Sequence, residues 1–380
     1  MRILLCGLLK YPAGDAGSVR QEKLAQLLMQ LGHEVMVAGL GAANGSKTEI
    51  CNGVAYTSFR SEKPGMPGKV QSHVQYWNKL KRLISEYKAE AVLTYDIGPG
   101  NVQKLKALCR KKGILLIHDS VEWYSPEQFR WGKLARSYRR KDRLNRRIID
   151  QSCRCIAISK FLLEHFSSKG IQTVNIPIMV TPEDICREKH LQEDKVVFTY
   201  AGQPGKKDYL YVMLDAFLLL PEDLRKKAVF HIVGCTAQQM VAAGISAQVL
   251  EQLKSQLVIH GRVPRDTVLE LLKETDFTLL MRSAEQRYAK AGFPTKVVES
   301  LSAATPVICN LTSDLADYLA DGKDALIVEN CSAEALKVQL TKAIQMSCEQ
   351  RTEMCNHAAQ TAERCFLYTN YLEQMQTILQ

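Results

Sequence analysis

Residues 290–309 read KAGFPTKVVESLSAATPVIC, and this stretch says most about how the chain folds. Gly292 and Pro294 precede a helical pattern, which leads into the apolar run Thr305–Cys309. A helix that begins in this way exposes the free N–H groups of its first turn, where the helix dipole favours an anion. Glu299, one turn further on, offers a carboxylate that accepts hydrogen bonds from sugar hydroxyls. The stretch therefore predicts a phosphate-binding site beside a residue that contacts a sugar. An ordinary amphipathic helix is the alternative.

Apolar runs of strand length alternate with helical patterns along the whole chain. The first series is Ile3–Cys6, Val35–Gly39, Ala91–Tyr95, Ile114–His118 and Cys155–Ser159, and the second is Val196–Gly202, Val229–Gly234, Leu257–Gly261, Phe277–Met281, Pro306–Cys309 and Ala325–Val328. Such alternation predicts an α/β fold with parallel sheets covered on both faces. A chain of 380 residues also exceeds what one hydrophobic core usually supports, so two Rossmann-like domains are expected.

The domain boundaries are predicted from a polar stretch between the two series, Ile176–Lys195, which contains two prolines. We expect an N-terminal domain over residues 1–180, a linker over residues 181–195 and a C-terminal domain over residues 196–365. Residues 366–380 are expected to form a helix that packs back on the N-terminal domain.

Composition places the chain among globular proteins, with 46% apolar and 24% charged residues and a net charge of +10. Twelve cysteines without a CxxC pair, among them Cys6, Cys155 and Cys309 in apolar runs, indicate buried thiols in a reducing compartment. The first apolar run is too short for a signal peptide, and no run is long enough to span a membrane. We therefore expect a cytoplasmic protein, unless a membrane holds it by its surface.

The segment around Glu299 resembles the donor-binding motif of family 4 retaining glycosyltransferases, bacterial polysaccharide-type enzymes with the GT-B fold. In that motif two glutamates stand eight positions apart, and the first would fall here at Ala291. The resemblance implies two Rossmann-like domains facing across a cleft, with the N-terminal domain on the acceptor side. It implies that Glu299 binds the ribose of a nucleotide diphosphate sugar. We expect the backbone of Gly292, Phe293, Pro294 and Thr295 to serve the sugar and phosphates.

Two further segments of the first half match the family pattern at strand ends, where ligands bind in such sheets. Gly17 matches the glycine-rich first loop, which implies a place at the donor–acceptor junction; a flexible surface loop is the alternative. His118 aligns with the histidine that contacts the donor sugar, a catalytic role, although a structural histidine is the alternative. Asp119 is a base or orients His118, and Arg20 is a phosphate contact or a helix-surface charge.

Two segments of the second half complete the predicted site. Gly202 opens a loop that contains Lys206 and Lys207, and this pair suits the neutralisation of a departing diphosphate. The family commonly carries an arginine where this chain has Gln203. Arg262–Val263 resembles the loop whose backbone meets the nucleobase. A solvated lysine pair and a plain turn are the respective alternatives.

Basic residues are concentrated in one stretch, Arg130–Arg147, which holds nine lysines and arginines and one acid. Helical spacing places many of them on one face of a helix. Aromatic residues, including Trp123 and Trp131, lie near the start of this stretch in the sequence. An anionic membrane surface attracts this combination. The residues expected at the acceptor or membrane are Arg139, Arg140, Arg143, Arg147 and Trp123. No nucleic-acid motif is present, and a solvated basic helix is the alternative.

Metal chemistry has little support, because the histidines are dispersed and the chain lacks the DxD motif of metal-dependent glycosyltransferases. We expect no metal and no cofactor, with the nucleotide diphosphate sugar as a substrate. The resemblance implies a retaining, metal-independent, hexosyltransferase-type enzyme that transfers to a lipid-linked or polysaccharide-precursor acceptor. A catalytically silent GT-B binding subunit, suggested by Ala291 and Gln203, and a nucleotide-sugar 2-epimerase are the alternatives.

Overall fold

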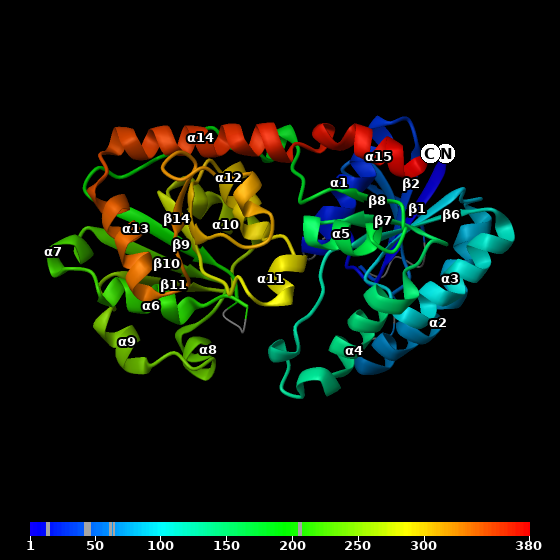
Figure 1. Ribbon diagram of the computed structural model, residues 1–380, viewed down its shortest axis with the longest axis horizontal. Helices are drawn as coiled ribbons and strands as arrows, with labels where there is room; N and C mark the ends of the chain where they lie inside the picture. Colours follow the sequence, from blue (N-terminus) through cyan, green and yellow to red (C-terminus); the bar gives the residue numbers. More distant parts are fainter. Residues whose placement is uncertain (13–15, 42–46, 61–62, 64, 204–206) are drawn as a thin grey trace. The chain divides into compact units, whose positions relative to one another are not determined.

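The computed structural model describes residues 1–12, 16–41, 47–60, 63, 65–203 and 207–380. The chain divides into two compact units (Figure 1). Unit 1 consists of Met1–Met179, Ala291–Phe293 and Tyr368–Gln380, and unit 2 consists of Val180–Lys290 and Pro294–Leu367. Each unit is built around its own largely parallel sheet, as the alternating sequence pattern predicts.

Within the described residues, unit 1 contains an eight-stranded sheet in the order β3-β4-β2-β1-β5-β6-β7-β8. The strands are β1 (Arg2–Gly7), β2 (Glu34–Gly39), β3 (Glu49–Cys51), β4 (Val54–Ser58), β5 (Ala91–Tyr95), β6 (Leu115–Ser120), β7 (Arg154–Ala157) and β8 (Thr173–Asn175). The α-helices of this unit are α1 (Ala16–Gln30), α2 (Gly65–Glu86), α3 (Pro99–Lys112), α4 (Arg136–Arg143), α5 (Lys160–Ser167) and α15 (Leu372–Leu379). A π-helical turn, Leu144–Ile148, continues α4.

The central strand β1 shows why the sequence pattern is continuous and apolar instead of alternating. Ile3 and Leu5 belong to a core that α1 and α15 cover, with Leu24 of α1 and Met375 of α15 among its members. Leu4 and Cys6 are also completely buried, although successive residues of a strand point to opposite faces. Both faces of the strand are therefore covered, as expected for a parallel sheet.

One edge of this sheet departs from the parallel arrangement. β3 pairs with β4 in antiparallel register, which the sequence pattern does not predict. The turn between them is Asn52-Gly53, with φ angles of 49° and 78°. Asn-Gly suits a tight hairpin turn because both residues tolerate positive φ. This dipeptide is the signal in the sequence that identifies the hairpin; β8, only three residues long, carries no comparable signal.

Within the described residues, unit 2 contains a six-stranded parallel sheet in the order β11-β10-β9-β12-β13-β14. The strands are β9 (Val196–Ala201), β10 (Ala228–Val233), β11 (Leu257–Gly261), β12 (Phe277–Leu280), β13 (Val307–Asn310) and β14 (Ala325–Val328). The helices are α6 (Leu210–Leu218), α7 (Glu222–Arg225), α8 (Ala237–Ala242), α9 (Ala247–Gln252), α10 (Arg265–Lys273), α11 (Arg287–Ala291), α12 (Thr295–Ser302), α13 (Ala333–Gln345) and α14 (Cys348–Phe366), of which α11 ends at Ala291 in unit 1. Every strand of the second predicted series is present within two residues of its expected bounds.

Aromatic stacking organises the core of unit 2. Phe217 of α6 stacks on Phe230 of β10 at 4.7 Å between ring centroids and meets Phe198 of β9 edge-on at 5.4 Å. All three side chains are completely buried. Such pairs add about 0.5–1.5 kcal/mol beyond the burial of their area, so α6 is held firmly on β9 and β10.

The segment expected to link the domains packs on unit 2. The Lys189 ammonium donates hydrogen bonds to the carbonyl oxygens of Leu272 and Thr275 and to the Thr305 hydroxyl, at 2.5 to 2.9 Å. Burial lowers the pKa of Lys189 to about 8, because the charged form loses its hydration. The linker residues around Lys189 are therefore anchored to one unit.

At the other end of the chain, residues 368–380 belong to unit 1, where the carbonyl of Ile378 accepts a hydrogen bond from Arg154 at 2.9 Å. All twelve cysteines lie in the described residues and carry free thiols. Cys6, Cys155 and Cys309 are buried, as the sequence predicts. None of the described helices combines the length and the apolar character that crossing a membrane requires.

Candidate active site

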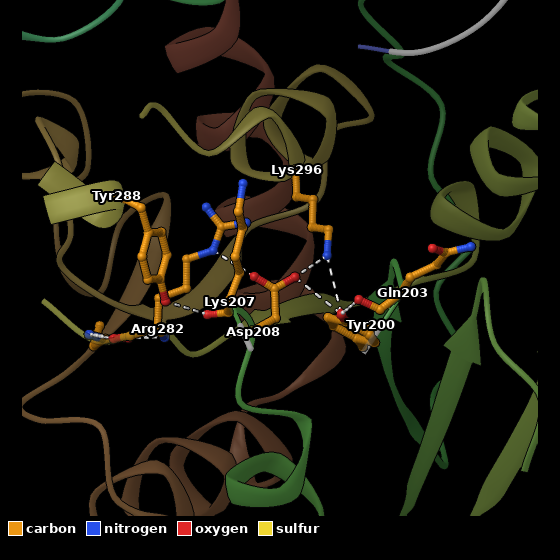
Figure 2. Close-up of polar contacts among 8 residues, drawn as sticks. Tyr200, Gln203, Lys207, Asp208, Arg282, Tyr288 and Lys296 are labelled. Carbon is orange, nitrogen blue, oxygen red and sulfur yellow. Dashed lines mark hydrogen bonds and ion pairs between the residues drawn. The ribbon is translucent and has the colours of Figure 1, made fainter. Parts of the chain in front are cut away.

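A cluster of paired charges lies at the carboxyl edge of the second sheet. β10 follows β9 on one side of the sheet and β13 follows β12 on the other, so the strand order reverses between β9 and β12. Ligands of open α/β sheets bind outside the carboxyl ends of the strands at such a reversal. Tyr200 lies near the end of β9, Arg282 follows β12, and Lys296 lies in the first turn of α12 (Figure 2).

Asp208 is the centre of this cluster. Its carboxylate accepts a hydrogen bond from Nε of Arg282 at 2.6 Å and one from the Tyr200 hydroxyl at 3.1 Å. Nζ of Lys296 bonds to the same carboxylate and lies 4.4 Å from the centroid of the Tyr200 ring (Figure 2). The side chains of Asp208, Arg282 and Lys296 are 5%, 17% and 27% exposed. Two cations thus share one carboxylate, which leaves a net positive charge among these three side chains.

The protonation states in the cluster follow from burial and from these neighbours. Burial alone raises the pKa of the Asp208 carboxyl, but Arg282 and Lys296 outweigh it and hold the pKa at about 2. Burial lowers the pKa of the Lys296 ammonium, while Asp208 opposes that shift. Asp208 is therefore ionised at neutral pH and keeps both cations in place.

The loop after β9 passes very close to Lys296. A Cβ atom on Gly202 would lie 2.0 Å from Nζ of Lys296, so a side chain there would displace the ammonium from its place beside Asp208. A Cβ atom on Gly234, whose φ is +105°, would lie 2.6 Å from the carbonyl oxygen of Gly202. Glycine is required at position 234, because the φ is positive and two backbone segments meet directly there.

Of the two predicted diphosphate lysines, Lys207 lies beside this cluster. Its side chain is exposed, and its carbonyl oxygen accepts a hydrogen bond from the Tyr288 hydroxyl at 2.9 Å. Lys206 lies outside the described residues.

The start of α12 has the form that the sequence predicts. Pro294 precedes the helix, Thr295 is its first residue, and the first turn has neither a side-chain cap nor an acid. Glu299 is half-buried, and burial raises the pKa of its carboxyl although Arg265 and Lys296 oppose the shift. The two other residues of the predicted donor motif, Gly292 and Phe293, belong to unit 1.

The predicted nucleobase loop follows β11, which ends at Gly261 with a φ of 64°. Arg262 is exposed and Val263 is half-buried. Among the described residues, no three or more His, Cys, Asp or Glu side chains are grouped so as to hold a metal ion.

His118 and Gly17 both lie at the carboxyl edge of the first sheet. His118 is 1% exposed, and its Nδ1 lies 3.0 Å from the Thr94 hydroxyl, while its Nε2 has no hydrogen-bond partner among the described residues. Burial, and then the charge of Lys141, lower the pKa of His118 to about 3, so the ring is neutral at physiological pH. A Cβ atom on Gly17 would lie 2.5 Å from the Tyr95 hydroxyl, so a side chain there would require the Tyr95 ring to move.

Arg20 and Asp119 form a buried ion pair, which contradicts one of the two alternatives expected for each residue. Nη2 of Arg20 lies 2.8 Å from Oδ1 of Asp119, and Gln21 donates to the other carboxylate oxygen at 2.9 Å. Arg20 also donates to the carbonyl oxygens of Ile176 and Pro177. Arg20 is therefore not a surface charge, and Asp119 orients Arg20 instead of His118.

The four arginines expected at the acceptor or membrane are exposed, but Trp123 is not. Arg139, Arg140, Arg143 and Arg147 are all exposed on α4 and the π-helical turn. Trp123 is 3% exposed, donates to Asp142 at 3.0 Å and carries the Arg146 guanidinium 5.1 Å from its ring centroid. Its expected place at a membrane surface is therefore wrong, because the ring is covered by the protein. The exposed apolar side chains of this region are instead Trp131 and Leu134, at 69% and 74%.

Sequence reasoning missed the four residues at the centre of the second site: Tyr200, Asp208, Arg282 and Lys296. A signal existed for two of them. Arg282 directly follows the predicted strand Phe277–Met281, and Lys296 follows the expected helix start. Asp208 and Tyr200 carry no such signal, because their meaning depends on partners far away in the sequence.

Two family models match successive parts of the chain. The model described as Glycosyltransferase Family 4 matches residues 18–182, and the model described as Glycosyl transferases group 1 matches residues 183–363. The chain belongs to the family 4 glycosyltransferases. A sequence search of curated proteins found no significant match.

Solved structures show that this glycosyltransferase has the GT-B fold. Sucrose-phosphate synthase from Thermosynechococcus elongatus aligns over 100% of this chain and 98% of its own, with a TM-score of 0.74 and 14% identity. WaaG, a glycosyltransferase involved in lipopolysaccharide biosynthesis, aligns over 99% of both chains with a TM-score of 0.69 and 16% identity. HepE from Anabaena, in complex with UDP, aligns over 100% of this chain and 99% of its own, with a TM-score of 0.67 and 14% identity. The predicted α/β fold with two Rossmann-like domains is thereby confirmed.

Proposed function

We propose that this glycosyltransferase transfers a hexosyl group, with retention of configuration, from a nucleotide diphosphate sugar to a lipid-linked or polysaccharide-precursor acceptor. The observation that carries the proposal is the Asp208 cluster, which holds Lys296 and Arg282 at the reversal point of the second sheet. A diphosphate is the ligand whose charge and shape suit two cations beside an uncapped helix start. HepE, a protein of similar fold, was crystallised with UDP and with UDP-glucose, which supports a nucleotide-sugar donor.

In this proposal the cluster acts mainly on the leaving group. Departure of the sugar places negative charge on the diphosphate, and fixed cations stabilise that charge more in the transition state than in the ground state. Lys296 and Arg282 supply this stabilisation, and Lys207 adds an exposed cation at the same edge. Because Asp208 holds Lys296 and Arg282 before the donor arrives, little rearrangement is required during the reaction.

The remaining roles follow the family resemblance. Glu299 accepts hydrogen bonds from the ribose hydroxyls, and the backbone of Arg262 and Val263 meets the nucleobase. His118 contacts the donor sugar as a neutral ring, since its pKa is far below physiological pH. The acceptor's proton passes to the departing diphosphate oxygen, so the mechanism requires neither a protein base nor a metal.

The proposal extends to the place of the enzyme in the cell. Exposed arginines along α4, with Trp131 and Leu134 beside them, suit the anionic face of a membrane. We expect a cytoplasmic enzyme that binds the inner face of the membrane peripherally, where a lipid-linked acceptor is accessible.

The proposal is tested by incubating the full-length protein with UDP-, GDP- and ADP-sugars and measuring release of the nucleoside diphosphate. Slow hydrolysis of one donor is expected, together with release of a sugar of retained anomeric configuration. Binding of a nucleotide without any turnover, with or without an acceptor extract, would indicate a silent binding subunit. Lys323→Met, which replaces an exposed lysine that is not part of the cluster, is assayed alongside the wild type and should hydrolyse the same donor.

A further inference from the structure

Unit 1 contains a second charged site that the donor chemistry does not use. A groove of about 760 Å³ lies between the first turn of α3 and the basic segment formed by α4 and the π-helical turn. Its lining includes six arginines: Arg136, Arg139, Arg140, Arg143, Arg146 and Arg147. Asp142 is the one acid in that lining, and it is bonded to Arg146 and Trp123. Positively charged side chains therefore greatly outnumber negatively charged ones in the lining of the groove.

A smaller pocket of about 130 Å³ shares Gly98, Pro99 and Arg140 with this groove. It lies at the reversal point of the first sheet, because Leu8 follows β1 and Asp96 follows β5, and both line it. Its volume is that of a few water molecules, each of which occupies about 30 Å³ in the liquid. The pocket therefore admits a single small group that enters from the groove.

Lys141 is the unexplained residue of this pocket. Its side chain is only 4% exposed, and its Nζ has no hydrogen-bond partner among the described residues. The nearest carboxylate oxygen belongs to Asp96 and lies 3.9 Å away, too far for a hydrogen bond. A buried ammonium with three unused donors is unfavourable unless something accepts from it. An anion in the pocket satisfies this requirement.

The start of α3 points to the same kind of ligand. This helix has 14 residues, begins at Pro99 after Gly98, and has neither a side-chain cap nor an acid in its first turn. A Cβ atom on Gly98 would lie 2.7 Å from Nη2 of Arg140, so the guanidinium packs directly against the helix start. The positive end of the helix dipole and Arg140 therefore face the same pocket as Lys141.

We propose that this pocket binds a phosphoryl group of the acceptor substrate, held by Lys141, Arg140 and the start of α3. The inference rests on the proposed glycosyl transfer, since it assigns the site to the acceptor. A flat membrane surface does not satisfy Lys141, because the ammonium is buried and only a protruding group reaches it. The phosphoryl group belongs either to the phosphate that joins a glycan to its lipid or to a phosphate carried on a sugar.

The test compares the wild type with Lys141→Met, which keeps the length of the side chain and removes its charge. Calorimetry with inorganic phosphate, glucose 1-phosphate and a short-chain polyprenyl diphosphate in micelles is carried out on the full-length protein in the presence of UDP. Lys141→Met should weaken phosphate-group binding at least tenfold, and Arg140→Gln should weaken it severalfold. Lys111→Gln, which removes an exposed lysine of α3 outside the pocket, should bind as the wild type does.

The three ligands distinguish the source of the phosphoryl group. Tighter binding of the polyprenyl diphosphate than of glucose 1-phosphate indicates the lipid anchor, and the reverse order indicates a sugar phosphate; either order supports the site. Unchanged affinity for all three ligands in folded Lys141→Met overturns it. UDP binding is measured in the same proteins. If the wild type does not bind UDP, the proposed donor is contradicted. Weaker phosphate binding in Lys141→Met with unchanged UDP binding concerns only this pocket. If Lys141→Met does not fold, Arg140→Gln, at an exposed position, decides by the same criterion.

Discussion

The two sheets place cations at their reversal points in different ways. In unit 2, Lys296 and Arg282 are bonded to Asp208, so the positive site contains its own counter-ion. In unit 1, Lys141 lies 3.9 Å from its nearest carboxylate, and the arginines of the groove outnumber the acids that line it. A site whose cations are hydrogen-bonded to an internal acid is ordered before its ligand arrives. A buried ammonium whose carboxylate neighbour lies beyond hydrogen-bonding distance depends more on an incoming anion for its stability.

The largest expected effect comes from removing a cation of the ordered site. Lys296→Met should lower kcat/KM by about 10²–10³-fold, because one fixed electrostatic donor to the leaving diphosphate is lost. Steady-state kinetics on the donor identified in the hydrolysis screen measures this. Lys323→Met should retain wild-type kinetics, and an equal kcat/KM in folded Lys296→Met would remove Lys296 from the site.

Removing the internal acid should reveal its contribution to stability. Because the pKa of Asp208 is about 2 in the folded protein and about 3.9 in an unfolded chain, the carboxylate contributes roughly 2–3 kcal/mol at neutral pH. This contribution is lost as the pH falls through about 4 to below 2, where Asp208 becomes protonated in both states. Denaturant unfolding of wild type and Asp208→Asn should therefore differ most at pH 6 and by much less near pH 2. A difference that stays constant with pH would show that Asp208 is not held by its two cations.

A smaller effect is expected at the ribose contact. Glu299→Gln should weaken UDP binding about tenfold, or 1.4 kcal/mol, because the hydrogen bonds lose their charge assistance. Burial raises the pKa of Glu299. As the pH is lowered, the affinity of the wild type for UDP should therefore begin to fall at a higher pH than it would for an exposed glutamate. The Gln variant should lack that dependence. Calorimetry across a pH series measures both, and an unchanged affinity would contradict the ribose role.

The smallest effect is expected for single arginines on the exposed surface of α4 and the π-helical turn. Arg143→Gln should weaken sedimentation with vesicles that contain anionic lipid by about fivefold, since one basic residue contributes roughly 1 kcal/mol there. Replacing Arg139, Arg140, Arg143 and Arg147 together should abolish it, and added salt should release the wild type. Lys323→Gln in unit 2 is the control. Normal binding of the fourfold variant to these vesicles would show that α4 is only a solvated helix.

The positions of most strands were predictable, because both faces of a parallel sheet are buried and its strands appear as apolar runs. The hairpin β3–β4 escaped this reasoning, since an edge with exposed residues such as Ile50 leaves no apolar run. Trp123 was placed wrongly for a related reason. Composition shows that a ring lies near basic residues, but not that Asp142 and Arg146 enclose it.

Of the second site, the sequence alone determined the parts that are local: the helix start at Pro294 and Thr295, the position of Glu299 one turn later, and the strands that lead to them. These features depend on neighbours within a few residues, so spacing is sufficient to predict them. Only the tertiary structure decided that Asp208 joins Lys296, 88 residues away, and that Arg20 joins Asp119, 99 residues away. A carboxylate acquires its partners when the sheet brings strand ends together, and the order of strands that does so cannot be derived from the composition of any one segment.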